Sequence, residues 1–448
     1  MKKKLIAAMM SLSMVAALAG CGSSNNETTA AATTAATTAA ETTAADTTAA
    51  ETTPASTELK LTYSGTPEVH EKEYLVNEYF KAFEEEYGVK VTVDFVSQAD
   101  AIKKIQSEQD TGNIVSDILY VDTANMAPYV NGGWMEDISA IVDATGSTYT
   151  DMYDAITNDG SARYFVPNSF DVYITIANKK ALDYLPEGLT EDDVVAGITW
   201  EQYAQWAVNI AEGEGEGEGK TMMPASMEGS QLLYPMAGMS LAYGGGFPEF
   251  TSEGFKSALG LIAQMAEGNA FYAEQDQYTA VTEPLNSGDV WLAFSHMAPA
   301  GTSYNAAPNS YVIGAAPKGS EGAGSTSGAW CYGIQKGAPN QDLAEKFIEY
   351  IARPEVNYDF CSNYGGALSP IAEVMDQLDS EDAVMRAGLE MLADTTISGV
   401  PSTEYSDWNA VKLLYGKVFN EVLDTKEVPS DDYLAGIQTD LEALKLAE

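Results

Sequence analysis

Near the start of the folded part, two segments of alternating apolar and polar residues flank a helical pattern. Residues 58–65 and 89–96 show the period of two that is typical of a strand. Between them, apolar residues recur at helical spacing before a glycine: Val76, Phe80, Phe83, Tyr87 and then Gly88. We therefore predict a β-α-β unit with two parallel strands, whose helix ends at that glycine because glycine accepts the left-handed conformation of a C-cap.

Strand and helix patterns continue to alternate along the rest of the chain. Residues 116–122 form a nearly continuous apolar run, as expected for a strand that is covered on both faces. Residues 288–296 and 327–335 also predict strands, and a further helix opens with Thr199 and Gln202, which have the spacing of a capping box. This alternation predicts the α/β class with open, mainly parallel sheets, in which ligands bind at the carboxyl ends of the strands.

The first 57 residues follow a different pattern and predict no core. A basic start and an apolar run over residues 5–17 precede Leu18-Ala19-Gly20-Cys21, which is the order of parts in a secretory leader. The Ala/Thr-rich tract that follows has almost no large apolar side chain, so burial cannot offset the entropy of ordering it. We predict a signal peptide over residues 1–20 and a disordered tether over residues 21–57.

The charge of the chain narrows the possible partners. It carries 66 acidic and 23 basic residues, for a formal net charge of −43. Such an excess disfavours contact with the phosphates of nucleic acids and favours solubility outside the cell. Because no apolar run after the leader is long enough to span a bilayer, we expect the folded part to lie outside the membrane and to bind no nucleic acid.

The few cysteines and histidines give no sign of a metal site. Apart from Cys21, only Cys331 and Cys361 remain, and they form either one disulfide or two small buried apolar residues. The two histidines, His70 and His296, are far apart in the sequence, and no Cys–His spacing of a zinc site occurs. We expect no structural metal and no cofactor.

Several spaced segments together resemble the family-1 extracellular solute-binding proteins of ABC importers, which include the maltodextrin-binding proteins. In chain order the segments are LKLTYSG, SDILYVDTANMAPYVNGGWMEDIS, RYFVPNSFDVYITIANKKALD, ITWEQYAQWA, LNSGDVWLAFSH and GAWCYGIQKGAPNQDLAEKFIEYIARPE. The position of Cys21 directly after the leader similarly resembles the lipobox of bacterial lipoproteins. In that family the cysteine receives fatty acyl chains such as palmitate and becomes the mature N-terminus.

The resemblance implies a two-lobed, periplasmic-binding-protein-like fold of type II. Each lobe is an open sheet flanked by helices, and the chain crosses the hinge between them more than once. By similarity, lobe 1 is 58–169 plus 333–392, and lobe 2 is 170–332 plus 393–448. The lobes close on a small-molecule solute by a hinge motion. The resemblance also implies a monomer, lipid-anchored at the extracellular face of the cell membrane, whose partner is an ABC permease.

Two strand ends of lobe 1 are expected to bring polar side chains to the cleft. Tyr63 can stack on a sugar, although its parity with the neighbouring apolar residues leaves a core role open, and Glu68 can accept hydrogen bonds from hydroxyl groups. Asp122 ends the buried strand, and its carboxylate suits bidentate acceptance from adjacent hydroxyls. The alternative for Asp122 is that it caps the helix that follows.

The resemblance implies two further sites on the cleft. Maltodextrin-binding proteins have a sugar-contacting carboxylate four residues after the equivalent of Pro167, and Asp171 stands at that position, with Asn168 as a second candidate. The strand over residues 288–296 ends with Ser295 and His296, where the family usually has small or aromatic cleft residues. His296 departs from that pattern, so it either contributes to selectivity or is a surface residue.

Aromatic residues complete the predicted site. The segment GVPSTEYSDWNAVKLL resembles the one in which maltodextrin-binding proteins present a tryptophan to a sugar, which makes Trp408 the strongest candidate. The alternative is that Trp408 packs at the start of its helix, since tryptophan is highly buried on average. Trp330 follows Gly328 in a loop that often faces the cleft in this family. The weaker aromatic candidates are Tyr234, Tyr243 and Tyr364.

These observations favour a lipid-anchored receptor that captures a carbohydrate, expected to be an oligosaccharide, and delivers it unaltered to a permease. One alternative keeps the fold but binds a cationic solute such as a polyamine or peptide, whose affinity should fall steeply with salt. The other is a glycoside hydrolase, which needs two carboxyl groups about 5 Å or about 6.5–9.5 Å apart. No spacing in the sequence marks such a pair, so we expect no enzymatic activity.

Overall fold

The described residues of the computed structural model begin at Thr57. They are residues 57–150, 157, 162–213, 219–223, 231–378, 381–401 and 404–446. The predicted leader, Cys21 and the tether as far as residue 56 lie outside them. Among the described residues, no helix combines the length and the apolar character that crossing a membrane requires.

The sheet of the first lobe has five strands in the order β2-β1-β3-β11-β4. Its strands are β1 (Glu58–Ser64), β2 (Lys90–Val96), β3 (Ile118–Asp122), β4 (Val166–Phe170) and β11 (Ala329–Ile334). The predicted β-α-β unit is confirmed, because β1 pairs in parallel with β2. The expectation of mainly parallel sheets is wrong, since β11 runs antiparallel to both of its neighbours, β3 and β4.

The helix between β1 and β2 differs from the prediction. It consists of α1 (Val69–Tyr74), a π-helical turn η1 (Leu75–Tyr79) and α2 (Phe80–Tyr87), and it ends as expected at Gly88, whose φ is 66°. A π-helical turn inserts an extra residue and so rotates the buried face. For that reason Leu75 and Tyr79 are buried, whereas Val76, which the spacing places on the apolar face, is 44% exposed.

The second lobe contains two smaller sheets, in the orders β6-β7-β5-β8 and β12-β10-β9. The strands of the four-stranded sheet are β5 (Tyr173–Asn178), β6 (Thr221–Met222), β7 (Leu292–His296) and β8 (Tyr311–Gly314). The others are β9 (Lys318–Gly319), β10 (Gly322–Ser327) and β12 (Thr395–Gly399). Since β5 is antiparallel to β7 and β8 while β6 and β7 are parallel, this sheet is mixed as well.

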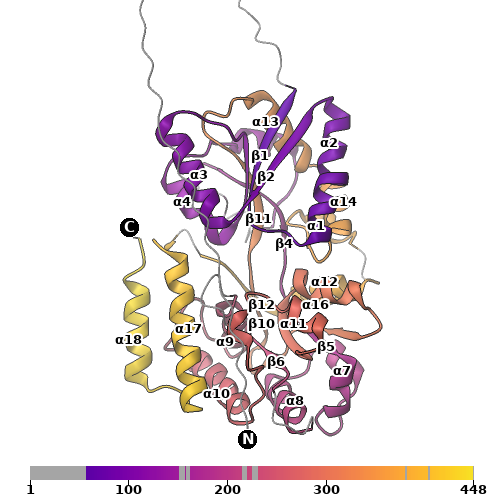
Figure 1. The fold of residues 1–448 in the computed structure, drawn as a ribbon, viewed down its shortest axis with the longest axis vertical. Coiled ribbons are helices and arrows are strands. Elements are labelled where there is room, and N and C mark those ends of the chain that lie inside the picture. The colour runs from indigo at the N-terminus through magenta and orange to yellow at the C-terminus, as the bar shows by residue number, and fades with distance from the viewer. Residues whose placement is uncertain are drawn as a thin grey trace, which may run out of the picture. The chain divides into compact units, whose positions relative to one another are not determined.

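Helices cover both groups of sheets. Around the first sheet lie η2 (Thr123–Asn125), α3 (Gln98–Thr111), α4 (Ala127–Asn131), α5 (Ser139–Thr145), α13 (Gln341–Ile351), α14 (Pro354–Tyr364) and α15 (Ala372–Met375). Around the others lie η3 (Lys179–Tyr184), α7 (Glu191–Ala196), α8 (Trp200–Gly213), α9 (Leu233–Ala242), α10 (Glu253–Glu267), η4 (Gln275–Gln277), α11 (Thr282–Ser287), α12 (Met297–Ala306), α16 (Ala383–Asp394), α17 (Trp408–Thr425) and α18 (Asp431–Glu442). Figure 1 shows both groups.

The chain passes between the two groups of strands with very short breaks. Only Asp171 and Val172 separate β4 of the first sheet from β5, and only Gly328 separates β10 from β11. The two crossings are joined, because the Ser327 hydroxyl donates to the Asp171 carbonyl at 2.6 Å. The predicted lobe boundaries stay a prediction. Similarity assigned α16 to lobe 1, but this helix packs against β8 and β10, which belong to the sheets of the second lobe.

Two local predictions can be checked directly. The capping box of α8 is confirmed, since the Thr199 N–H donates to Gln202 Oε1 at 2.8 Å and the Gln202 N–H donates to Thr199 Oγ1 at 3.2 Å. Of the two alternatives for Cys331 and Cys361, the structure has the second: both thiols are free and buried. Burial raises the pKa of both thiols, so they are small apolar residues of the core.

Candidate binding site between the lobes

A cavity of about 580 Å³ lies where the strands of the two lobes meet. Its walls come from the ends of β1, β3 and β4, from the β10–β11 crossing, and from α9, α12 and α17. The aromatic residues of the lining are Tyr63, Phe170, Tyr173, Tyr234, Trp330 and Tyr364. The charged ones are Glu68, Glu71, Asp122, Asp171 and Lys412. Flat rings with a few polar groups among them are the usual lining of a small-molecule site.

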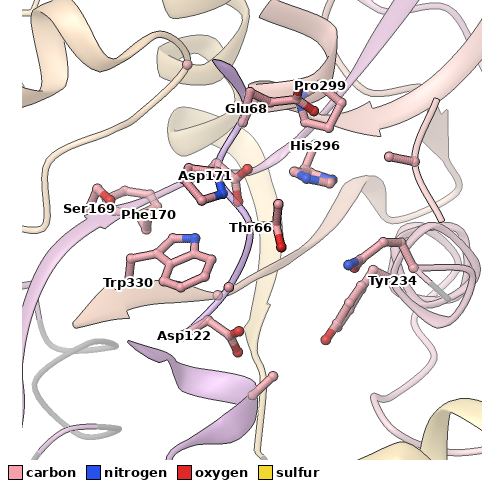
Figure 2. Close-up of a pocket in the computed structure, with 18 of the residues that line it drawn as sticks. Thr66, Glu68, Asp122, Ser169, Phe170, Asp171, Tyr234, His296, Pro299 and Trp330 are labelled. Carbon is pink, nitrogen blue, oxygen red and sulfur yellow. The ribbon is translucent and has the colours of Figure 1, made fainter. Parts of the chain in front are cut away.

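The Trp330 indole is the central ring of the cavity wall. It lies at the start of β11, stacked on Tyr120 with ring centroids 5.3 Å apart, and its centroid is 5.5 Å from that of Tyr63. A Cβ atom at Gly65 would come within 3.1 Å of the Trp330 ring, so glycine lets the chain after β1 pass close to it. These neighbours hold the half-buried indole in place with one side open to the cavity (Figure 2).

Asp122 and Lys412 form one end of the cavity. Asp122, the last residue of β3, accepts hydrogen bonds from Asn125 Nδ2 to both carboxylate oxygens at 2.9 Å, and from the Gln98 amide. Burial raises the pKa of Asp122, and the positive charge of Lys412 opposes this. Burial lowers the pKa of Lys412, and the negative charge of Asp122 opposes this fall. Lys412 Nζ lies 5.9 Å from the centroid of the Tyr234 ring. This end therefore presents both an acceptor and a compensating donor.

Three carboxyl groups form the other end: Glu68, Glu71 and Asp171. Glu71 is only 6% exposed, and it accepts a hydrogen bond from the Glu68 N–H at 2.7 Å as part of the capping box of α1. Burial is the largest cause that raises the pKa of Glu71 to about 7. Burial also raises the pKa of Asp171 to about 8, the charge of Glu71 adds to this, and a hydrogen bond from the Ala298 N–H opposes it. Figure 2 shows Glu68 and Asp171 on one side of Trp330 and Asp122 on the other.

The wall opposite Trp330 is built by the second lobe. Tyr234 on α9 is buried, and its hydroxyl accepts a hydrogen bond from the indole N–H of Trp408 at 3.2 Å. His296 ends β7 with its ring centroid 5.6 Å from that of Tyr173. Burial lowers the pKa of His296 to about 4, so the imidazole is neutral near pH 7.

Seven of the ten residues predicted from the sequence line this cavity. They are Tyr63, Glu68, Asp122, Asp171, Tyr234, His296 and Trp330. Tyr63 combines the two roles left open for it, since it is 2% exposed yet reaches the cavity wall, where its hydroxyl lies 3.3 Å from that of Tyr364. Whether each of the seven contacts a ligand stays a prediction.

Three predicted residues lie elsewhere. Trp408 is 7% exposed and packs edge-on against Phe247 and Tyr405, so it supports Tyr234 from behind rather than facing the cavity. Asn168 is buried within β4, where its Oδ1 accepts a hydrogen bond from the Tyr79 hydroxyl at 3.2 Å. Ser295 faces a separate small cavity of about 10 Å³ behind His296.

Of the three weaker aromatic candidates, Tyr234 and Tyr364 line the main cavity. Tyr243 does not, and its hydroxyl donates a hydrogen bond to Glu201 at 2.6 Å.

The sequence reasoning missed two charged residues of the site. Lys412 follows Trp408 by one helical turn, so residue spacing places both on the same side of α17. Glu71 follows Glu68 at the spacing of a capping box, a pattern that the sequence contains. Neither signal distinguishes a lining residue from a surface one. Within the part of the chain that the structure describes, no group of three or more metal-ligating side chains comes together.

Comparison with solved structures identifies the same fold in other binding proteins. A solute-binding protein of an ABC transporter from Thermotoga lettingae, bound to α-D-tagatose, has a TM-score of 0.72 at 17% identity, with 87% of this chain and 100% of that chain covered. A Listeria monocytogenes ABC substrate-binding protein in complex with cycloalternan has a TM-score of 0.67 at 17% identity, covering 87% and 98%. UgpB of Mycobacterium tuberculosis, in complex with glycerophosphocholine, has a TM-score of 0.70 at 15% identity, covering 88% and 99%. The predicted two-lobed α/β fold is confirmed.

The sequence itself matches a family of known role. No curated protein sequence matches it significantly. The model of the family described as "Bacterial extracellular solute-binding protein" matches residues 78–387, which is more than half of the chain. Proteins of this kind work with ABC transporters and carry their solutes without chemical change. The chain therefore belongs to the bacterial extracellular solute-binding protein family.

Proposed function

We propose that this protein is a monomeric, lipid-anchored receptor that captures a carbohydrate between its lobes and delivers it to an ABC permease. The observation that carries the proposal is the Trp330 ring with hydrogen-bonding side chains at both of its edges. A sugar has an apolar face of C–H bonds and a rim of hydroxyl groups. An indole face suits the first, and carboxylate and amide side chains suit the second.

The Asp122 end is well suited to adjacent hydroxyl groups. The Asp122 carboxylate is an acceptor held by Asn125 and Gln98, and Lys412 is a donor that faces it. Hydroxyl groups both donate and accept, so a pair of them can satisfy both charges at once. Two of the structural neighbours hold carbohydrates in the same fold. Because another holds glycerophosphocholine, the solute must be set by side chains rather than by the fold.

Binding of a carbohydrate can be tested with the purified protein and a panel of neutral and charged sugars. A ligand that binds only the native state raises the melting temperature, and calorimetry then gives its affinity. We expect at least one sugar to bind, and Trp330→Ala to abolish its thermal shift. Trp134→Phe is the matched control, since Trp134 does not line the cavity. A protein that binds polyamines or peptides and no sugar would contradict the proposal.

The lipid anchor is a separate proposal that rests on the sequence around Cys21. Cells that express the protein should incorporate labelled palmitate into it, and Cys21→Ala should remove the label and release the protein from the membrane fraction. Cys361→Ala is the control, because that thiol is buried in the folded part. Equal labelling of the two variants would show that Cys21 is not the acylated residue.

A further inference from the structure

The two ends of the cavity differ in how their negative charge is compensated. Burial raises the pKa of Asp122, and the positive charge of Lys412 opposes this rise. Among the described residues, no ion pair joins Glu68, Glu71 or Asp171 to a lysine or arginine. The groups that shift the pKa of Glu71 and Asp171 are likewise burial, hydrogen bonds and other carboxylates, with no cation among them.

Uncompensated buried carboxylates are unfavourable unless protons or a cationic group of a ligand neutralise their charge. The surroundings of Glu71 and Asp171 suit a cation, because Trp330 and Tyr63 border the same part of the lining and aromatic faces attract cations. Thr326 is 1% exposed and belongs to the lining, yet its hydroxyl has no hydrogen-bond partner in the structure.

We infer that the solute is an amino sugar, whose protonated amine is held by Glu71 and Asp171 while Asp122 and Lys412 bind its hydroxyl groups. This inference rests on the proposed function, since it names the class of carbohydrate. A simple polyamine would bring a second cation toward Lys412, which is unfavourable because like charges repel. An anionic sugar would bring its charge toward three carboxylates. An amino sugar satisfies both ends of the cavity at the same time.

The test compares pairs of sugars that differ only in the replacement of hydroxyl by ammonium. Glucose with glucosamine and galactose with galactosamine replace one hydroxyl, and cellobiose with the β-1,4-linked glucosamine disaccharide replaces one hydroxyl on each ring. Calorimetry on the full chain at pH 7 measures both members of each pair. We expect the amine member of at least one pair to bind about tenfold more tightly or better, as a charge-assisted contact predicts.

Variants then locate the ammonium group. Glu71→Gln and Asp171→Asn remove a charge but keep the shape and an acceptor oxygen, so each should reduce the affinity for the amine member about tenfold. The affinity for the neutral member should fall much less than that for the amine member, which separates loss of a charge partner from general damage to the site. Glu73→Gln is the matched control, because Glu73 is an exposed acid on the same helix as Glu71 and does not line the cavity.

The outcomes separate this inference from the proposed function. If neutral sugars bind as tightly as their amine counterparts in every pair that binds, the inference is wrong and the carbohydrate proposal stands. If Glu71→Gln and Asp171→Asn weaken both members of a pair equally, the carboxylates do not bind the amine, and the inference is also wrong. If no sugar of either kind binds, the carbohydrate proposal itself fails.

Discussion

The two ends of the cavity carry the same chemical group in opposite electrostatic surroundings. The Asp122 carboxylate receives hydrogen bonds from Asn125 and Gln98 and lies near a lysine. Glu71 and Asp171 line the same cavity with no such cation acting on them, and the pKa of both is raised into the neutral range. One end therefore has its charge partner within the chain, whereas the other requires either protons or a ligand.

The largest effect is expected at the ring that both ends share. Trp330→Ala removes the flat surface between them and should weaken sugar binding by about 2 kcal/mol or more, as is common for a central tryptophan. Trp330→Phe, which keeps a ring on the same strand, should recover part of this loss in calorimetry. A loss below about 0.5 kcal/mol for the alanine variant would mean that the ring is not the binding surface.

Removing the cation should make the two ends alike. Lys412→Met keeps the length of the side chain but leaves Asp122 without a charge partner, so the pKa of Asp122 should rise. We expect sugar affinity at pH 7 to fall by about 1–2 kcal/mol, the size of one charge-assisted hydrogen bond. Lys417→Met, at an exposed position of the same helix, should have no effect on affinity. An unchanged affinity for Lys412→Met would show that the charge of Lys412 does not matter.

The uncompensated end should be visible in the pH dependence of stability. Burial raises the pKa of Asp171 to about 8 in the folded protein. At any pH between the ordinary pKa of an aspartate and 8, this carboxyl therefore binds more protons in the folded protein than in the unfolded chain. The free energy of unfolding contributed by this group therefore falls as the pH rises through that range. Solvent screening of the half-buried carboxyl limits the effect to about 1 kcal/mol between pH 6 and pH 8.

Chemical denaturation of the ligand-free protein at these two pH values tests this. Asp171→Asn should lose less stability than the unsubstituted chain from pH 6 to pH 8, and Asp143→Asn, at an exposed position, should lose as much as the unsubstituted chain. If Asp171→Asn has the same pH dependence as the unsubstituted chain, Asp171 carries no raised pKa.

The smallest effect is expected behind the cavity wall. Trp408→Phe keeps a buried ring but removes the hydrogen bond to the Tyr234 hydroxyl. Sugar affinity should fall by about 0.5–1 kcal/mol, through looser placement of Tyr234. Tyr234→Phe should cause a similar loss, and the double variant should be no worse than either single one. A loss for Trp408→Phe that exceeds that of Trp330→Ala would instead indicate direct contact with the sugar.

Local patterns predicted the elements well, because alternation and helical spacing depend on neighbouring residues. The strands β1, β2 and β3 and the capping box of α8 follow from such patterns. Strand direction does not, since β11 runs antiparallel only because the chain enters the first sheet from the second lobe. The π-helical turn at η1 also has no clear sign in the sequence, and it changes which residues are buried.

Three residues predicted at or just after strand ends line the cavity, whereas Trp408, predicted at the start of a helix, does not. Asp122, Asp171 and His296 follow strands, and in α/β proteins the ends of strands converge on one place. Trp408 and Lys412 are one turn apart on α17, and the tilt of that helix decides which of them faces the cavity. That tilt depends on packing against α9 and α10, which residue spacing does not reveal.

The two short crossings between the lobes have a mechanical consequence. Asp171 and Gly328 lie at these crossings, line the cavity and are connected through Ser327. When two bodies rotate about an axis, points near the axis move least. If the lobes open about these crossings, a solute held by Asp171 keeps that contact through the whole motion, so it would be the first contact made on capture and the last one broken on release.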